Sequence, residues 1–268
     1  MSKLKHTLII AGLLAAPAGA MAAEPASPHT ITGNVGMYSD YIFRGISQTG
    51  GDPAIQGGLD YSHSSGFYLG TWGSNVGWLE DYQGYSSGNV ELDLYGGYRG
   101  TAGPISFDVG LIGYFYPGDK PAGTTKADTT EAYVSLGWKW FTVKYSYALS
   151  DTVFGFGQPT GAFDADGSDY LELNASVPIG ETGLTLGAHW GTFNFKNYGA
   201  QDYTDWKISA AYDMGKLSSV MSGVTLGVAY SDTDVDGGNG TAFSGPWTDG
   251  NGRDLGDDTA FVWISKAF

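Results

Sequence analysis

Charged side chains in this sequence recur at every second position within apolar segments. Glu91 and Asp93, for example, alternate with Val90, Leu92 and Leu94. Because alternate side chains of a β-strand point to the same face, such a segment puts its charges on one face and its apolar groups on the other. A face that carries charges of both signs is typical of a surface that selects ions or solutes in water, and less typical of a catalytic site.

Thirteen charged residues share the polar face of the predicted strands and are the candidate functional residues. Buried charges must pair or contact water, so two hypotheses stay open for them. They line an aqueous channel, where side-chain charges set ion preference, or they form a salt-bridged plug in a closed barrel. The set comprises Asp40, Arg44, Asp60, Glu91, Asp93, Arg99, Asp108, Glu131, Lys139, Lys144, Glu172, Lys207 and Asp213.

Arg44 is the first choice among these candidates, with Asp40 four residues away on the same predicted face. It could face a solute path. Alternatively, it could tie neighbouring strands together by pairing with Asp60 or Asp93, and both hypotheses predict the same contacts.

The histidine and cysteine content argues against catalysis. Beyond residue 22 the histidines are His29, His63 and His189, and no Ser/His spacing suggests a nucleophile with its base. The sequence has no cysteine, which excludes a disulfide scaffold, a thiolate metal site and a lipid anchor on cysteine. We therefore predict no catalytic residue, no cofactor and no enzyme activity.

The net charge of −15 makes nucleic acid a poor partner, because its phosphates would repel the protein. Acidic chains of low hydrophobicity can be disordered. The 18 Tyr, 13 Phe and 8 Trp argue against disorder here.

The alternating pattern predicts an all-β protein with about twelve strands and no long helix. Most of these strands have roughly the length that a tilted membrane strand needs, about 9–11 residues. The predicted strands are 30–47, 53–62, 66–76, 88–100, 104–116, 129–139, 141–149, 169–178, 183–195, 203–214, 223–232 and 257–268.

The connections alternate between short and long. Short ones include 64–65, 101–103 and 180–182, whereas the long ones reach 150–168 and 233–256. This alternation with an even strand count is typical of outer-membrane barrels, whose turns face the periplasm and whose loops face outside. The sequence thus predicts a transmembrane antiparallel β-barrel with short periplasmic turns and longer extracellular loops.

Aromatic residues near the predicted strand ends favour a membrane barrel over a soluble sandwich, because they suit the girdles at the two membrane interfaces. Ordinary core aromatics are the alternative. The clusters are Tyr41 with Phe43, residues 114–116, residues 138–141, and Trp263 with Phe268.

The last predicted strand ends in Phe268 and has Ile264 and Val262 on the same face. This resembles the C-terminal insertion signal of bacterial outer-membrane proteins. Lys266 departs from that signal, whose third-from-last position is more often aromatic or apolar.

The N-terminus has a basic start, an apolar run over 8–16 and small residues at Ala20 and Ala22. This pattern predicts a cleaved signal peptide over residues 1–22 and a barrel domain over 23–268. Export to the outer membrane of a Gram-negative cell is expected, with membrane lipid and lipopolysaccharide as partners. The sequence does not specify the oligomeric state.

Four segments together carry a family resemblance: residues 39–48 (SDYIFRGISQ), 53–61 (PAIQGGLDY), 66–75 (GFYLGTWGSN) and 91–98 (ELDLYGGY). They resemble the TorF-type porins, a proteobacterial family, over roughly residues 30–117. The resemblance implies a porin and supplies no substrate and no catalytic residue.

The predicted outer loops hold most of the acidic excess, with only Lys120, Lys126, Lys196 and Arg253 as bases. Asp232, Asp234 and Asp236 are spaced like the start of a calcium loop, but Phe243 stands where an EF-hand needs a bidentate glutamate. These aspartates are weak metal candidates, and solvated acidic loops are the alternative.

The leading functional prediction is a porin or channel for the diffusion of small hydrophilic solutes or ions, selected by lumen width and charge. The alternative is a closed barrel that acts as a structural or surface-interaction protein through its acidic loops.

Overall fold

The computed structural model describes residues 27–81, 83–157, 163–235, 247–248 and 252–268. The expected signal peptide over residues 1–22 lies outside these ranges. No helix in the described ranges is long and apolar enough to cross a membrane.

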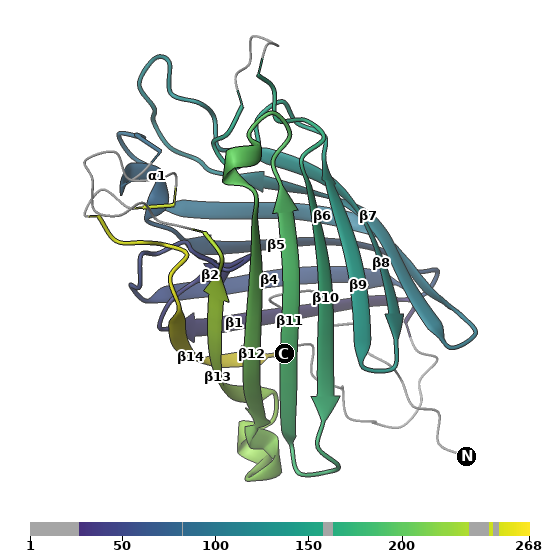
Figure 1. Cartoon of the computed structure of the whole chain (residues 1–268). Coiled ribbons are helices and arrows are strands. Elements are labelled where there is room, and N and C mark those ends of the chain that lie inside the picture. Colours follow the sequence, from purple (N-terminus) through teal and green to yellow (C-terminus); the bar gives the residue numbers. More distant parts are fainter. Residues whose placement is uncertain (1–26, 82, 158–162, 236–246, 249–251) are drawn as a thin grey trace.

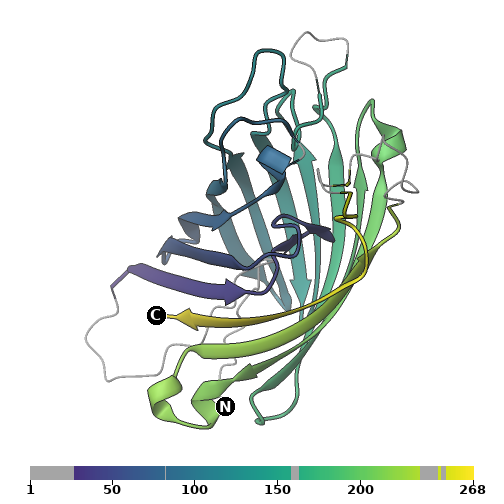
Figure 2. The ribbon, with the colours of Figure 1, turned by 90° about the vertical axis from the view of Figure 1, so that its left-hand side faces the viewer.

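Twelve antiparallel strands form one closed barrel, which confirms the predicted fold class (Figure 1). Each strand pairs with its neighbours in the chain, and β14 closes the barrel against β1 (Figure 2). Their bounds are β1 His29–Tyr38, β4 Ala54–His63, β5 Phe67–Asn75, β6 Val90–Ala102, β7 Ile105–Phe115, β8 Thr129–Trp138, β9 Phe141–Ala148, β10 Asp169–Pro178, β11 Leu184–Asn194, β12 Tyr203–Asp213, β13 Val224–Thr233 and β14 Thr259–Ala267.

The predicted first strand, 30–47, is wrong at its end. The barrel strand β1 ends at Tyr38, and the chain then forms a separate two-stranded hairpin of β2 (Ile42–Phe43) and β3 (Ile46–Ser47). The alternating pattern continues through this hairpin because β2 and β3 are themselves strands. Periodicity alone therefore could not separate them from β1.

The longer connections lie at one end of the barrel, together with the hairpin and the short helix α1 (Trp78–Asp81). The tight turns lie at the other end, where η2 (Met214–Lys216) and η3 (Ser219–Met221) join β12 to β13. A third short helix, η1 (Gly199–Gln201), joins β11 to β12 at the loop end. We call the two ends the loop end and the turn end.

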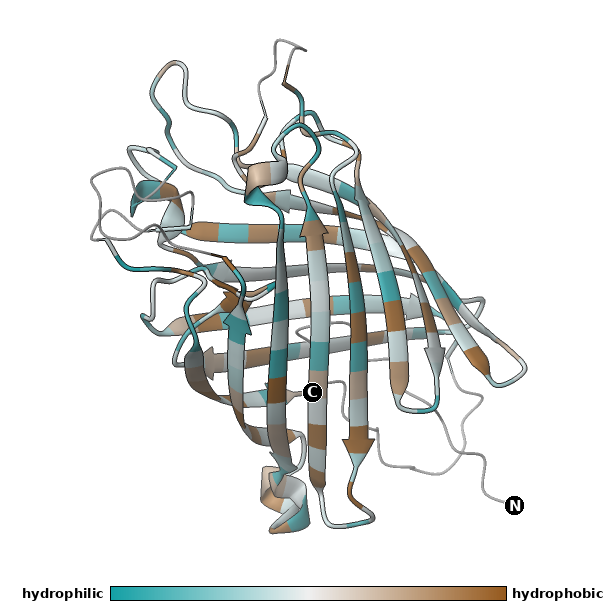
Figure 3. Cartoon of the chain, viewed as in Figure 1, coloured by the Kyte–Doolittle hydropathy of each residue, from teal (hydrophilic) through white to brown (hydrophobic). Residues whose placement is uncertain are grey.

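The outer face of the barrel carries many exposed apolar side chains. Hydropathy alternates along the strands (Figure 3). Soluble proteins rarely expose a contiguous apolar surface of this extent, whereas a lipid bilayer requires one. One member from each of nine strands is Ile31, Leu59, Leu94, Leu111, Leu136, Leu173, Ile208, Val228 and Val262, which are 48% to 74% exposed.

Barrel closure depends on the last residues of the chain. Phe268 and Gly33 exchange two backbone hydrogen bonds of 2.9 Å, and a Cβ at Gly33 would lie only 2.6 Å from the Phe268 ring. Gly33 thus makes room for the terminal ring. Lys266, which departs from the insertion signal, donates a hydrogen bond to the Ser222 carbonyl in the connection between β12 and β13.

The expected aromatic girdles are only partly present. Trp138, Trp140 and Phe141 are about half exposed near the turn end. The cluster of Tyr41 with Phe43 and the tyrosines Tyr114 and Tyr116 lie inside the barrel instead, and Trp263 stacks on the inward Tyr38. The alternation already indicated this for Tyr114 and Tyr116, because they continue the face of Asp108.

Leu111 tests the lipid-facing assignment because it lies near the middle of β7 and is 55% exposed. Replacing Leu111 with Lys should lower the free energy of unfolding by about 2–4 kcal/mol, since it puts a charge near the bilayer midplane. Denaturant titration in liposomes measures this change.

The matched control is Val220→Lys, because Val220 is 89% exposed in the connection between β12 and β13. A charge near the interface costs about 0–1 kcal/mol. Equal small effects at both positions would contradict a lipid-facing β7.

Candidate functional site in the barrel lumen

The hairpin β2–β3 lies inside the barrel and reaches across it. Its turn residues Arg44 and Gly45 have φ of 47° and 81°, as in the turns that favour tight hairpins. A Cβ at Gly45 would lie 2.5 Å from the side chains of Asp205 on β12 and Thr233 on β13. Only glycine fits at this tip, so the hairpin is closely packed against the barrel wall.

Arg44 connects the hairpin to the opposite wall. Its Nη1 and Nη2 donate to Oε1 and Oε2 of Glu131 on β8 at 2.8 and 2.7 Å. The two side chains are only 6% and 3% exposed. Such a bidentate pair fixes position and orientation together. We call the pair Arg44–Glu131 the latch.

Four aromatic rings enclose the guanidinium of the latch. Its Cζ lies 4.3 Å from the ring centroid of Tyr170 and 4.9, 5.0 and 5.7 Å from those of Phe193, Phe43 and Phe154. Cation–π attraction partly replaces the hydration that Arg44 loses on burial. The arginine therefore lies on a hairpin tip in an aromatic cage, and not on a barrel strand as predicted.

The expected partners of Arg44 were wrong. Neither Asp60 nor Asp93 pairs with it, because the hairpin carries Arg44 across the lumen to β8. Asp40 does not share a strand face with Arg44 either. It accepts hydrogen bonds from Ser47 Oγ at 2.7 Å and Thr49 Oγ1 at 2.9 Å, and so holds the base of the hairpin together.

The inward acids on β4 to β7 are held mainly by tyrosines. Glu91 accepts from Tyr41 and Tyr116, each at 2.7 Å. Asp60 accepts from Tyr95 at 2.8 Å.

Asp108 follows the same pattern and accepts from Tyr68 at 2.6 Å, while Tyr68 also contacts the Tyr133 hydroxyl. The exception is Asp93, whose Oδ1 is buried and has no hydrogen-bond partner among the described residues. Sequence analysis identified the acids but missed the tyrosines, although both occupy the alternate strand positions that point into the barrel.

A second polar network covers β9 to β12. Lys144 lies 3.8 Å from Glu172, which also accepts a hydrogen bond from Asn174 at 2.9 Å. His189 Nε2 donates to Asp205 Oδ1 at 2.9 Å, and its Nδ1 contacts the Asn174 side chain at 2.8 Å. The inward Lys207 is the register partner of His189.

Asp205 was missed by sequence analysis and is central to this network. Its side chain is 1% exposed, and it accepts from Tyr170 at 2.8 Å as well as from His189. The alternation along the strand could have identified it, because Asp205 shares the face of Lys207 and Asp213. It lies inside the predicted strand 203–214, so the alternation of that strand already applied to it.

Three predicted candidates lie near the turn end. Asp213 is exposed and accepts from the Gly215 backbone N–H at 2.8 Å, so it caps η2. Lys139 lies outside the lumen, in the turn between β8 and β9 with φ of 55°, and its Nζ is 4.6 Å from the Trp138 ring centroid. Arg99 stays inward, opposite Asp108, over the Tyr68 ring.

The two halves of the lumen differ. Toward the loop end, most inward side chains on the wall are buried, as are Glu91, Glu131, Tyr170 and Asp205. Toward the turn end, the inward residues of β9 to β14 are small and only half-buried. They include Thr142, Ser176, Gly187, Ser209, Ala211, Thr225 and Ser265. The lumen is thus filled toward the loop end, whereas its inward side chains toward the turn end are small and partly accessible to solvent.

The described residues at the loop end hold no group of three or more acidic or histidine side chains suited to a metal. Asp234 accepts from the backbone and hydroxyl of Thr204 at 2.6 and 2.7 Å, and Asp232 accepts from the Thr233 backbone at 2.9 Å. Asp236 lies outside the described residues. Asp232 and Asp234 thus accept hydrogen bonds from nearby backbone and hydroxyl groups at the loop end.

One ion pair joins two of the outer connections. Lys196 Nζ lies 3.1 Å from Asp166 Oδ1. The hydrogen bond from Lys196 lowers the pKa of Asp166 below its usual value.

A closed twelve-stranded barrel with an apolar outside and a charged interior defines the class of outer-membrane barrels. Residues 22–268 match the model of the family described as "Bacterial protein of unknown function (Gcw_chp)", so the chain belongs to this family. No curated protein matches the sequence significantly.

Solved porin structures share the fold. The KdgM porin superposes with a TM-score of 0.50 at 9% identity, covering 89% of this chain and 98% of that chain. A structure of KdgM in complex with disordered oligogalacturonate gives the same values. The NanC porin superposes with a TM-score of 0.51 at 13% identity, covering 88% and 98%. At such identities the similarity establishes the fold alone.

The latch predicts a large difference between single and paired substitutions. Glu131→Gln leaves Arg44 buried without its counter-charge, which should destabilise the barrel by about 3–5 kcal/mol. The double variant Arg44→Met with Glu131→Leu should recover most of this loss, because it removes both charges together. Denaturant unfolding in micelles measures each free energy.

The control pair is Lys126 with Asp128, which are 2.6 Å apart, with the Lys126 side chain 60% exposed. Lys126→Ala should cost about 0–1 kcal/mol. A loss on Glu131→Gln no larger than this control would show that the latch carries little energy.

Proposed function

We propose that the protein is an outer-membrane channel for small hydrophilic solutes or ions. The observation that carries this proposal is the partial exposure of small inward side chains toward the turn end. Inward side chains there are small and half-buried, so water reaches the interior of the barrel, whereas barrels of about eight strands are filled by side chains. Selection follows from lumen width and charge, and no chemical step is involved.

The charge of the interior favours cations. The inward acids that are at least partly buried are Asp40, Asp60, Glu91, Asp93, Asp108, Glu131, Glu172 and Asp205, and the inward bases are Arg44, Arg99, Lys144 and Lys207. Eight acids against four bases leave an excess of about four negative charges, which raises the local concentration of cations. A polyanion such as the oligogalacturonate of the KdgM complex suits this interior poorly.

The remaining assignments accompany the channel proposal. An N-terminal signal peptide over residues 1–22 would deliver the chain to the outer membrane, where its outer band would contact lipid and lipopolysaccharide. Residues 30–117 resemble the TorF-type porins. We propose that the protein is a porin of this type. The porin fold fits a protein without catalytic activity.

A second candidate is a closed barrel that serves as a structural or surface-interaction protein through its acidic loops. The filled half of the lumen at the loop end favours this candidate, because the hairpin and the aromatic side chains occupy the path of a solute. The two candidates differ in whether the hairpin can leave the lumen.

Ion selectivity tests the channel proposal in planar bilayers with a KCl gradient. The reversal potential should indicate cation preference. Asp60→Asn should reduce that preference, because it removes one inward charge and keeps the shape of the side chain. Glu181→Gln, in the exposed turn between β10 and β11, is the control and should leave the potential nearly unchanged. Anion preference in the unmodified protein would contradict the proposed role of the lumen acids.

Loss of the latch tests whether the hairpin limits conduction. Glu131→Gln removes the negative charge that holds Arg44 at the opposite wall, so the hairpin should leave its place more often. The variant should therefore show larger or more frequent conductance steps than the unmodified protein. Lys126→Ala is the matched control and should conduct like the unmodified protein. If both proteins insert correctly and neither conducts, the closed-barrel function is favoured instead.

A further inference from the structure

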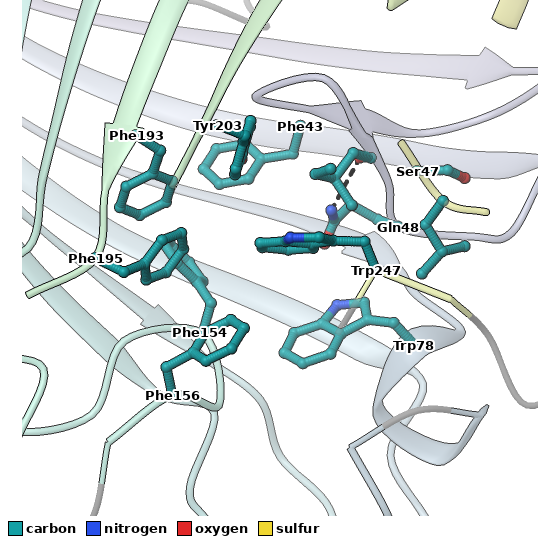
Figure 4. Close-up of a pocket in the computed structure, with 12 residues that line it drawn as sticks. Phe43, Ser47, Gln48, Trp78, Phe154, Phe156, Phe193, Phe195, Tyr203 and Trp247 are labelled. Carbon is teal, nitrogen blue, oxygen red and sulfur yellow. Dashed lines mark hydrogen bonds between the residues drawn. The ribbon is translucent and has the colours of Figure 1, made fainter. Parts of the chain in front are cut away.

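The aromatic side chains at the loop end line a partly open cavity of about 50 Å³. Figure 4 shows rings from the hairpin, α1, the connection after β9, β11, β12 and the connection after β13 converging on it. The lining residues are Phe43, Ile46, Ser47, Gln48, Trp78, Phe154, Phe156, Phe193, Phe195, Tyr203, Trp247 and Leu255. We call this space the aromatic cavity.

The rings around the aromatic cavity contact one another. Trp247 lies 5.1 Å from Tyr203, 5.6 Å from Phe156 and 5.9 Å from Phe195, measured between ring centroids. Phe193 and Phe195 stack at 4.0 Å. Aromatic rings at such distances favour offset and edge contacts with a further planar ring.

Packing alone does not account for the aromatic cavity. A protein interior seldom leaves voids larger than a water molecule, and one water needs only about 10–15 Å³. Three buried side-chain atoms lack a hydrogen-bond partner among the described residues, and one of them, Trp78 Nε1, belongs to a residue that lines this cavity. Trp78 is 9% exposed. An orphaned N–H of this kind suits an acceptor on a bound molecule.

The other polar side chains of the lining already have partners. Ser47 Oγ donates to Asp40 at 2.7 Å, and Gln48 Nε2 donates to the Ile46 carbonyl at 3.0 Å. A ligand would therefore meet mostly apolar surface and the Trp78 N–H.

The ligand should be neutral. The described lining residues include no carboxylate that could pair with a cation. Phe43, Phe154 and Phe193 also face the Arg44 guanidinium, which already uses their attraction for positive charge. An anion would lose its hydration in an apolar cavity without gaining a cationic partner on its lining.

We propose that the aromatic cavity binds a neutral solute with one aromatic ring and one hydrogen-bond acceptor, which accepts from Trp78 Nε1. Because 50 Å³ is less than the roughly 150 Å³ of a cavity that takes benzene, one lining ring shifts outward as the solute enters. The proposal goes beyond the proposed channel function and does not depend on conduction.

The test compares benzaldehyde with toluene, which matches it in size but lacks the carbonyl acceptor. Calorimetric titration of the full refolded protein, with micelles matched in cell and syringe, should show saturable binding with benzaldehyde ahead of toluene. Trp78→Phe keeps a ring and removes the donor, so benzaldehyde affinity should fall about five- to tenfold while toluene affinity holds. Trp138→Phe, on the outer face, is the matched control and should change neither affinity.

Leu255→Trp provides a second variant that fills the aromatic cavity and leaves Trp78 in place. It should abolish the saturable binding of both solutes, and heat-modifiable gel migration checks that each variant is folded. The site is overturned if the unmodified protein takes up no more benzaldehyde than empty micelles, or if Leu255→Trp binds it equally well. Equal affinity for benzaldehyde and toluene would overturn the donor role of Trp78. None of these outcomes bears on conduction.

Discussion

Backbone hydrogen bonding constrains this protein more than any side-chain contact. In the hydrocarbon core of a membrane no water is present to pair an exposed N–H or C=O group, so a sheet must close on itself. The pairing of β14 with β1 achieves this closure, and it depends on a glycine at position 33 that accommodates the terminal ring of Phe268. Closure then fixes which residues face lipid and which face the lumen, because the side chains of each strand alternate.

Closure also buries charged side chains inside the barrel, which costs free energy unless those charges are paired. Charges on the inward face cannot reach bulk water in the filled half, so each needs a local partner. Tyrosine hydroxyls supply most partners on β4 to β7, and Lys144 and His189 supply them on β10 and β12. Arg44 is the exception, since it comes from the hairpin and pairs with Glu131 across the lumen. The same interaction therefore neutralises a carboxylate of the barrel wall and positions the hairpin.

Most of the barrel could be predicted from sequence because the period of two is a local property. Strand β10 was predicted at its observed bounds, and the other strands after β1 differ by at most two residues at either end. The hairpin could not be predicted in this way, since it keeps the same period while changing direction. Asp205 and the inward tyrosines could have been found from parity, whereas the Arg44–Glu131 contact joins residues 87 positions apart. Only the folded chain brings those two together.

The number of strands explains why a connection between strands, the hairpin β2–β3, fills part of the lumen. Eight strands leave an interior that side chains fill, whereas sixteen or more leave a wide channel. Twelve strands enclose a space that wall side chains alone fill only in part, as the small residues toward the turn end show. The loop end is filled because the hairpin β2–β3 and the aromatic residues of the connections add volume there. The width of the path thus depends on where the hairpin lies, and the wall sets only the charge that a passing solute meets.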